Sequence, residues 1–476
     1  MDTETILRGV SLAAEFDADL GDPRRTRRVQ LIAERLAQNP ELSLPEAFSD
    51  PSELEATYRL LGNPRISLLK LLDAHVDATA KRCAGLGEVL AVHDTSELSF
   101  EVRGDHVREH LCRFSKARQG FHGHVTLAVS ADGLRAPLGA LNCFAYVHQD
   151  RVSPETKAFW TGLFGEYERE SERWSKAIIA SEQRIDGARV IHVCDREADM
   201  NSVLQTLHSR GSRYVIRAYQ QRKTSDGLRV GDVPALSSRA VRRTIELSER
   251  PVHATLPKSR KTFAPRAARR AEVIIRGHRA SFPIGSQLEV ELHVVEVREI
   301  APPGDEPPVH WVLLTSEPIE TDAELLRVVD LYRSRWLIEE YFKAIKTGCA
   351  YEARQLDSAS TLLAALGITL VLAWQLLVLR HLSRLEEHRP DSAPPLPASV
   401  VLSPQLLAIL VAMTPKLRWP EQPTLRDVVR GIARLGGHHS SNGPPGWQVL
   451  GRGLRKLVAT YDAARLVARA GLVIEP

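Results

Sequence analysis

The pattern of apolar and polar positions changes several times along the chain. Residues 1–70 place apolar residues at helical spacing among many charges. From about residue 87, short runs rich in Val and Ile take over, such as EVLAVHD and RVIHVCD, and helical spacing returns at 322–347. Because period-two runs indicate strands and longer periodic segments indicate helices, we predict an α/β chain with a mixed sheet between two helical ends.

A second strand pattern lies inside this α/β region. Alternating runs such as AEVIIRG and LEVELHVVEV are separated by Pro and Gly, which predicts a β-rich insertion over about 224–318. We therefore expect a helical N-terminal domain over 1–70, an α/β domain with the insertion over 71–370, and a helical C-terminal domain over 371–476.

Several residues predict where helices begin or end. Asp22 and Pro23 are suited to the N-cap and first position of a helix, Thr321 and Glu324 have the spacing of a capping box, and Gly348 suits a helix end. Residues 362–379 contain no charge and reach the lower limit for a membrane span. The stretch stands alone and contains Gly367 and Gln375, so we predict a buried core helix.

Composition narrows the class of protein. A chain of 476 residues is too long for one core, and 63 Lys and Arg against 59 Asp and Glu give a net charge of only +4. Only 12 of the cations are Lys, and this Arg excess suits phosphate binding. The five Cys form no C-x-x-C pair and the N-terminus does not resemble a signal peptide, so we expect a cytoplasmic protein without disulfides.

Two basic clusters suggest contact with a polyanion. Arg24, Arg25, Arg27 and Arg28 crowd the first turns of a predicted helix, where cations oppose the helix dipole. The segment 258–270, KSRKTFAPRAARR, carries six cations and no acid. A phosphate backbone would explain both clusters, whereas a solvated helix face or a plain linker remains the alternative.

Three groups of residues are candidates for chemistry. Tyr332, Arg335, Glu339 and Lys346 fall on one stripe of a helix predicted over 322–347, although Arg335 and Glu339 could also form an ordinary surface pair. Asp94 and Asp195 each end an apolar run, where ligands bind in α/β sheets. Together with Glu339, these two aspartates could hold two Mg²⁺ about 4 Å apart and act on a phosphodiester.

Several motifs together resemble a known family. HDTSELSF around Asp94, VCDREADM around Asp195 and Y-x(2)-R-x(3)-E-x(6)-K from Tyr332 to Lys346 are similar to the three signatures of the DDE transposases of the IS-4 insertion-sequence family. GDPRRTRR, WVLLTSEPIE and GIARLGG extend the resemblance along the chain in order.

The resemblance implies an RNase H-like catalytic core that is interrupted by the β-rich insertion. Asp94, Asp195 and Glu339 would bind two Mg²⁺, for which Mn²⁺ would substitute. Trp311 would stack on a base flipped out of the transposon end. The other implied DNA-contacting residues are Tyr332, Arg335, Lys346, Arg217, Arg24, Arg25, Arg28 and Arg59.

The implied activity is cut-and-paste transposition. The enzyme would bind terminal inverted repeats, cut through a hairpin intermediate and join 3′-OH ends to target DNA, as a homodimer in a bacterial cytoplasm, without a membrane or a small-molecule cofactor. Residues 453–471 are a candidate for the dimer contact, or a helix packed on its own domain. A nuclease or resolvase of the same fold, or a DNA-binding repressor, is the alternative. We expect His122 and His124 to be structural. His93 is expected to be a buried neutral imidazole, with metal contact as the alternative.

Overall fold

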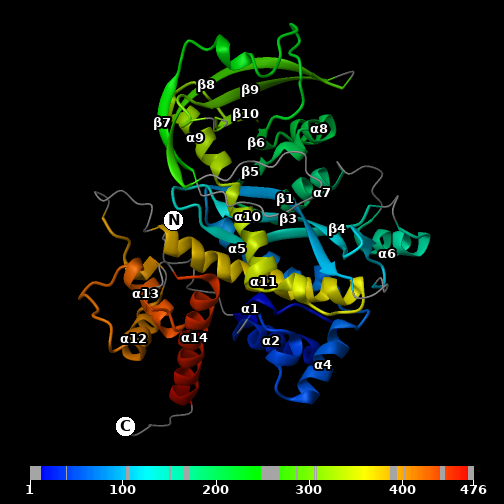
Figure 1. The fold of residues 1–476 in the computed structure, drawn as a ribbon, viewed down its shortest axis with the longest axis vertical. Coiled ribbons are helices and arrows are strands. Elements are labelled where there is room, and N and C mark those ends of the chain that lie inside the picture. Colours follow the sequence, from blue (N-terminus) through cyan, green and yellow to red (C-terminus); the bar gives the residue numbers. More distant parts are fainter. Residues whose placement is uncertain are drawn as a thin grey trace. The chain divides into compact units, whose positions relative to one another are not determined.

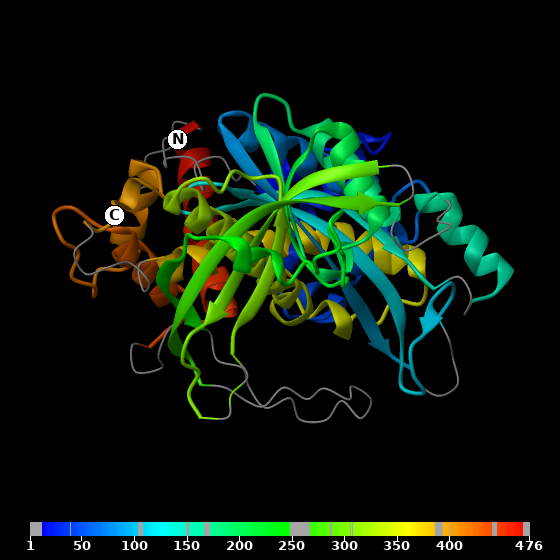
Figure 2. The ribbon, with the colours of Figure 1, turned by 90° about the horizontal axis from the view of Figure 1, so that it is seen from above.

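The computed structural model describes residues 12–38, 40–102, 108–148, 152–165, 172–247, 267–285, 288–304, 306, 308–385, 394–400, 402–439 and 445–469. The chain folds as two compact units (Figures 1 and 2). The first consists of Met1–Glu168, Ile179–Arg189 and Trp336–Pro476, and the second of Arg169–Ile178 and Val190–Arg335. The units are described separately below.

The first unit begins with five helices. They are α1 (Leu12–Glu15), α2 (Pro23–Gln38), α3 (Leu44–Ala47), α4 (Pro51–Leu61) and α5 (Leu68–Ala84). The Asp22 carboxylate accepts a hydrogen bond of 2.8 Å from the Arg24 amide, and Pro23 is the first residue of α2, which confirms the predicted helix start.

Four antiparallel strands follow in the first unit: β1 (Glu88–Glu101), β2 (Cys112–Arg113), β3 (Arg118–Ser130) and β4 (Pro137–Tyr146). β3 pairs with β1, with β4 and, near its start, with β2. The prediction that the first strand ends at Asp94 was wrong. Residues 95–101 stay in register with 118–124 of β3, so Asp94 lies in the middle of a long strand.

Helices cover this sheet. They are α6 (Pro154–Phe164), α10 (Trp336–Lys343) and α11 (Ala359–Leu385). The short helical turns Ala344–Gly348 and Tyr351–Ala353 lie between α10 and α11. α11 packs on α5 and β4. Its segment Ala359–Leu382 has a mean hydropathy of 2.4 and is long enough to cross a membrane, but 94% of its most apolar window is buried in the protein, as predicted for a core helix.

The C-terminal part of the first unit is helical. After Ala398–Val400 come α12 (Pro404–Met413), α13 (Leu425–Leu435) and α14 (Trp447–Arg469), which pack on one another. α14 also contacts α11 and α2, so this bundle and the N-terminal helices share one compact unit.

The second unit is built on a sheet in the order β5-β6-β10-β9-β8-β7. Its strands are β5 (Arg189–Cys194), β6 (Arg213–Arg217), β7 (Val241–Leu247), β8 (Arg269–Ile284), β9 (Leu288–Glu299) and β10 (His310–Thr315). β5 and β6 are parallel, and the later pairs are antiparallel. The predicted β-rich segment therefore extends the sheet of β5 and β6.

The helical elements of the second unit are Arg196–Ala198, α8 (Asn201–Arg210), Val233–Leu236 and α9 (Asp322–Arg333), while α7 (Glu172–Arg184) belongs partly to each unit. The core of the unit lies between α8, the sheet and α7, with Trp174, Leu207 and Phe282 fully buried.

The long helix predicted over 322–347 is interrupted. The capping box of Thr321 and Glu324 forms as predicted, but α9 ends at Arg333 and α10 begins at Trp336. A π-helical turn over Ala344–Gly348 then alters the spacing between Glu339 and Lys346. One regular stripe of four side chains is therefore not the correct description of Tyr332, Arg335, Glu339 and Lys346.

Candidate active site and DNA-binding surfaces

Two of the predicted metal ligands lie on elements that touch. Asp94 is half-buried on β1, and one of its carboxylate oxygens accepts a hydrogen bond of 2.8 Å from the Thr95 amide. α10 packs against β1 and carries Glu339, which is also half-buried. The first unit therefore brings the strand of one acid against the helix of the other.

The residues beside Asp94 are structural, as expected. His93 is fully buried, and its Nδ1 lies 2.9 Å from the Thr126 hydroxyl on the next strand. His124 contacts the Thr95 hydroxyl at 2.9 Å, and the His122 ring stacks on Tyr146. These contacts fix the registers of β1, β3 and β4.

Asp195 ends its strand, as predicted. It follows β5, is half-buried, and accepts a 2.8 Å hydrogen bond from the Glu197 amide as the N-cap of a short helical turn. Cys194 is paired with Ile216 in the parallel strand β6, so Asp195 and Arg217 are the next residues at the same carboxyl edge. The Arg217 guanidinium donates to the His310 carbonyl at 3.2 Å, at the start of β10.

Two predicted DNA contacts touch each other at this edge. The rings of Trp311 and Tyr332 meet edge to face with centroids 5.5 Å apart. Trp311 is half-buried, whereas Tyr332 is only 5% exposed. Tyr332 therefore packs against the Trp311 indole from a buried position, a contact that its spacing in the sequence did not indicate.

Lys346 lies beside an acid that sequence reasoning missed. Its ammonium is 3.8 Å from the Glu352 carboxylate, and Glu352 also accepts a 2.8 Å hydrogen bond from the Ser99 amide of β1. Lys346 is thereby held near the end of β1, within the first unit. Arg335 is half-buried in the turn between α9 and α10.

The donor set suits a hard divalent cation, because Asp94, Asp195 and Glu339 offer carboxylate oxygens and none is fully buried. Within the described ranges, no cluster of three His, Cys, Asp or Glu side chains is arranged to hold a metal. Asp94 and Glu339 belong to the first unit and Asp195 to the second.

The N-terminal arginines differ in their solvent exposure and in their contacts within the protein. Arg24 is exposed, and Arg59 is 72% exposed with only a loose 3.8 Å contact to Glu55. The Arg25 guanidinium donates to the Leu20 carbonyl at 2.9 Å, and Arg28 is half-buried. Arg24 and Arg59 are thus better placed to reach a phosphate than Arg25.

Most of the basic segment 258–270 lies outside the described residues. Its last two arginines are described at the start of β8. Arg269 forms ion pairs with buried Glu299 and with Glu306, whereas Arg270 is 78% exposed and lies 3.5 Å from Glu246. Arg269 is therefore a structural residue and not a candidate for DNA contact.

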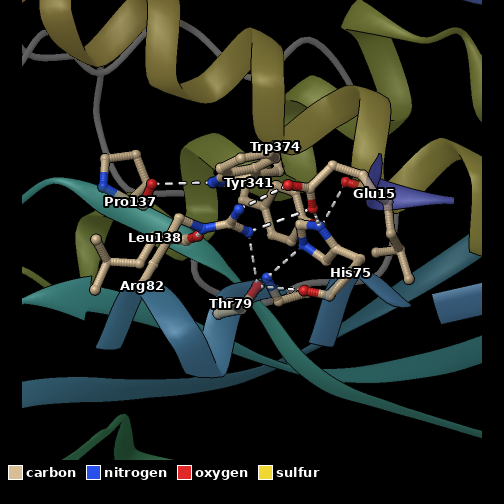
Figure 3. A network of polar contacts seen from close by, with 10 residues as sticks. Glu15, His75, Thr79, Arg82, Pro137, Leu138, Tyr341 and Trp374 are labelled. Carbon is tan, nitrogen blue, oxygen red and sulfur yellow. Dashed lines mark hydrogen bonds and ion pairs between the residues drawn. The ribbon is translucent and has the colours of Figure 1, made fainter. Parts of the chain in front are cut away.

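A buried polar network ties the N-terminal helices to the sheet of the first unit (Figure 3). Glu15 of α1 is 1% exposed and accepts hydrogen bonds from His75 Nδ1 and from Arg82 Nη1, the latter at 2.6 Å. His75 Nε2 accepts from the Ala140 amide at 3.0 Å, so His75 is neutral with its proton on Nδ1. The Arg82 guanidinium also lies 4.4 Å from the centre of the Trp374 ring.

This network shifts the pKa values of its members. Burial raises the pKa of Glu15, but hydrogen bonds and charges from His75 and Arg82 outweigh burial and leave it below its usual value. Burial lowers the pKa of His75, and Glu15 opposes this shift only in part. A negative Glu15, a positive Arg82 and a neutral His75 are thus the stable charge states.

Bulges in β4 provide the backbone partners of the network. The pairing of β3 with β4 shifts register on both sides of Leu127–Ala128. Trp374 Nε1 donates to the Pro137 carbonyl at 2.9 Å, and Arg82 Nε donates to the Leu138 carbonyl at 2.7 Å. Gly139 has φ +144°, and a Cβ there would lie 2.0 Å from the Thr79 hydroxyl, so only glycine fits.

A second attachment holds the segment before α3. The Arg354 guanidinium donates to the carbonyls of Leu42, at 2.6 Å, and Pro40, at 3.1 Å, and burial lowers the pKa of Arg354. Arg452 of α14 lies 3.6 Å from Glu41. The N-terminal helices are therefore fixed to the rest of the first unit at several points.

Family models match two regions of the chain. Residues 12–66 match the transposase DNA-binding domain and residues 175–375 match the transposase DDE domain, which together make up more than half of the chain. A DDE domain has an RNase H-like core, and the mixed α/β architecture with helical ends agrees with it, so the predicted fold class is confirmed.

One solved structure is similar at a low level. It is a cryo-EM structure of the piggyBac transposase synaptic complex with hairpin DNA, at 12% identity and a TM-score of 0.37 over 76% of this chain. The match covers 66% of that chain, just under two thirds. By the two domain matches, the chain belongs to the DDE transposases.

Proposed function

We propose that this protein is a cut-and-paste DNA transposase of the IS-4 insertion-sequence family, similar to the Tn-5 transposase. It binds terminal inverted repeats, hydrolyses phosphodiesters at the ends through a hairpin intermediate, and joins the 3′-OH ends to target DNA. The observation that carries the proposal is the order of a transposase DNA-binding domain before a DDE domain. The half-exposed Asp195 at the carboxyl edge of β5 and β6 supports it.

Asp94, Asp195 and Glu339 are the proposed catalytic acids. Bound divalent metal, two Mg²⁺ or the substituting Mn²⁺, would polarise the phosphodiester and lower the pKa of the attacking water. The chain supplies carboxylate oxygens for this purpose, held by the Thr95 amide in β1 and by the Glu197 amide after β5.

The proposed DNA-contacting roles follow from the family resemblance, and for Arg24 and Arg59 also from exposure. Arg24, Arg28 and Arg59 would engage the end repeat, while Arg217, Arg335 and Lys346 would hold phosphates near the cut. Trp311, braced by Tyr332, would stack on an unpaired base, which is worth about 1–3 kcal/mol.

The proposal includes the assembly and its setting. Residues 1–70 bind the ends, 71–370 catalyse, and 371–476 serve dimerisation and DNA contact in a homodimer that holds two ends. The enzyme acts in the bacterial cytoplasm on nucleoid DNA.

The test is incubation of the protein with a duplex carrying the inverted repeat that flanks its reading frame, Mg²⁺ and a target plasmid. We expect nicked, hairpin and joined products from the wild type. Asp94→Ala, Asp195→Ala and Glu339→Ala should bind the end and form none of these products. Asp186→Ala, at an exposed site, is the matched control and should retain activity.

The products separate the alternatives. Cleavage without joined plasmid would indicate a nuclease or resolvase, and end binding without cleavage by the wild type would indicate a repressor. Activity that survives all three substitutions would contradict the assignment of the acids.

A further inference from the structure

Helix α13 presents an exposed face made only of arginine. Of its eleven residues, Leu425–Leu435, only Arg426, Arg430 and Arg434 are exposed. They follow one another at intervals of four residues, so they line one side of the helix at steps of about 6 Å. We call Arg426, Arg430 and Arg434 the arginine stripe. In contrast, the exposed faces of α2 and α5 carry both signs of charge.

The stripe lacks acidic partners within the part of the chain that the structure describes. No carboxylate there lies within 4.0 Å of these guanidinium groups, and the one recorded side-chain hydrogen bond, from Arg434, goes to the His438 carbonyl at 3.3 Å. Asp427 is the acid nearest in sequence, but its carboxylate caps the helix by accepting from the Thr424 amide and hydroxyl. Many other arginines of this chain pair with acids, for example Arg184 with Asp73.

This arrangement costs helix stability. Like charges four residues apart destabilise a helix by about 0.2–0.5 kcal/mol per pair, and the stripe contains two such pairs. Arginine is also a poor choice for a face that only needs solvation, because alternating signs would serve better. A ligand with closely spaced negative charges would reverse the repulsion.

The helix beneath the stripe is held rigidly. The buried face of α13 packs on α14 with the two backbones in direct contact: a Cβ on Gly436 would lie 1.9 Å from the Val449 carbonyl oxygen, and one on Gly453 would lie 1.8 Å from that of Ile432. Gly431 similarly makes room for the Trp419 ring. The three arginines are thus presented from a fixed platform, which lowers the entropy cost of binding.

The platform is joined to the N-terminal DNA-binding region within the same unit. Arg452 of α14 donates to the Gly436 carbonyl at the end of α13 at 3.3 Å and also lies 3.6 Å from Glu41. Glu41 belongs to residues 12–66, which match the DNA-binding model. The stripe and the N-terminal DNA-binding region are therefore connected through α14 within one compact unit, so that one duplex can contact both.

We propose that the arginine stripe is a phosphate-binding surface that grips the DNA backbone independently of sequence. This inference rests on the proposed function and adds to it a named surface. Two steps of about 6 Å span about 12 Å, and each DNA strand carries a phosphate every 3.4 Å of axis, so the stripe can reach phosphates of several neighbouring nucleotides. Guanidinium groups donate two parallel hydrogen bonds to phosphate, which suits Arg better than Lys here.

The test compares Arg426→Gln/Arg430→Gln/Arg434→Gln with the wild type on a random-sequence duplex over a range of salt concentrations. Each lost phosphate contact lowers the salt slope of log K by about 0.9, so the triple variant should lose about 2.7 units of slope. The matched control, Arg189→Gln/Arg242→Gln/Arg279→Gln, removes the same charge from exposed arginines that have acidic partners and should retain the wild-type slope. Thermal melting shows that both variants are folded.

The outcomes separate this inference from the proposed function. Equal salt slopes of log K for the wild type and the stripe variant would overturn the inference. End cleavage by both proteins would at the same time leave the transposase proposal intact. Equal losses in the stripe and control variants would also overturn it, because net charge alone would then explain the effect. A wild type that binds no duplex contradicts both proposals. The stripe variant could instead keep wild-type DNA binding but no longer co-purify with an acidic protein that the wild type retains. That result would overturn the inference and assign the stripe to the protein partner.

Discussion

Asp195 and Asp199 stand four residues apart in the same VCDREADM segment and have opposite surroundings. Asp199 is fully buried, accepts from the Tyr219 and Gln220 amides at 2.7 Å, and pairs with Arg222 at 2.7 Å. Asp195 is half-buried at the strand end and accepts from the Glu197 amide. The buried Asp199 holds a loop in place, whereas the half-buried Asp195 remains accessible to a ligand.

The first unit repeats this contrast. Glu15 is buried among His75 and Arg82, whereas Asp94 and Glu339 are half-buried on β1 and α10. A carboxylate removed from water must have its charge and its lone pairs satisfied by the protein, so it is committed to the fold. Burial therefore separates structural acids from candidate catalytic ones when the motif alone does not.

The largest effect on stability is expected for Asp199→Ala. The substitution takes the carboxylate partner from the Arg222 guanidinium, whose side chain is only 9% exposed, and removes the acceptor of two amides, so the free energy of unfolding should fall by about 3–5 kcal/mol. Urea unfolding followed by circular dichroism measures the change, with exposed Asp186→Ala within about 0.5 kcal/mol as the control. A loss below 1 kcal/mol would contradict a structural role for the buried Asp199 carboxylate.

A moderate effect is expected from acid. Burial lowers the pKa of His381 to about 4 from its usual 6.5, and burial likewise lowers that of His75. The unfolded chain binds these protons first, so stability is full above pH 6.5 and falls as pH drops towards the folded values. His381 alone should remove about 2 kcal/mol between pH 7 and pH 5.

Glu15 extends this trend below pH 4.5, because its pKa is also lowered in the folded protein. Urea midpoints across this range provide the measurement, and His381→Gln should flatten the slope between pH 7 and pH 5. A midpoint independent of pH would contradict the burial of these side chains.

The smallest effect is expected for Arg270→Ala. Arg270 is 78% exposed and its contact with Glu246 is solvated, so the loss should stay within about 0.5 kcal/mol. Arg269→Ala, next to it, should cost several times more, since it leaves buried Glu299 without its cation. Equal losses for both would contradict the use of burial as the criterion.

Local signals predicted much of this structure. The cap at Asp22, the capping box at Thr321 and the strand end at Asp195 depend on residues close in sequence, and all three form as predicted. The sequence did not show that β1 continues past Asp94, because that extension depends on pairing with β3. The break at Ser334 and Arg335 contains neither Gly nor Pro, so no local signal marked it.

Long-range contacts were also not predicted from the sequence. The partners of Glu15 lie 60 and 67 residues away, and Arg354 reaches back more than 300 residues to Pro40 and Leu42. Single charged residues in polar helices give no sign of such burial. The arginine stripe was hidden for a related reason, since only the packing of α13 on α14 shows which of its positions are exposed.

In the proposed function, the half-exposed acids perform the chemistry, whereas the buried acids hold the fold. The most direct measurement is the single-turnover rate of end cleavage by Asp195→Asn with all DNA bound. We expect a rate lower by about a thousandfold or more, equivalent to about 4 kcal/mol, with an unchanged urea midpoint. Cleavage at the wild-type rate, or a loss of activity explained entirely by unfolding, would contradict the claim.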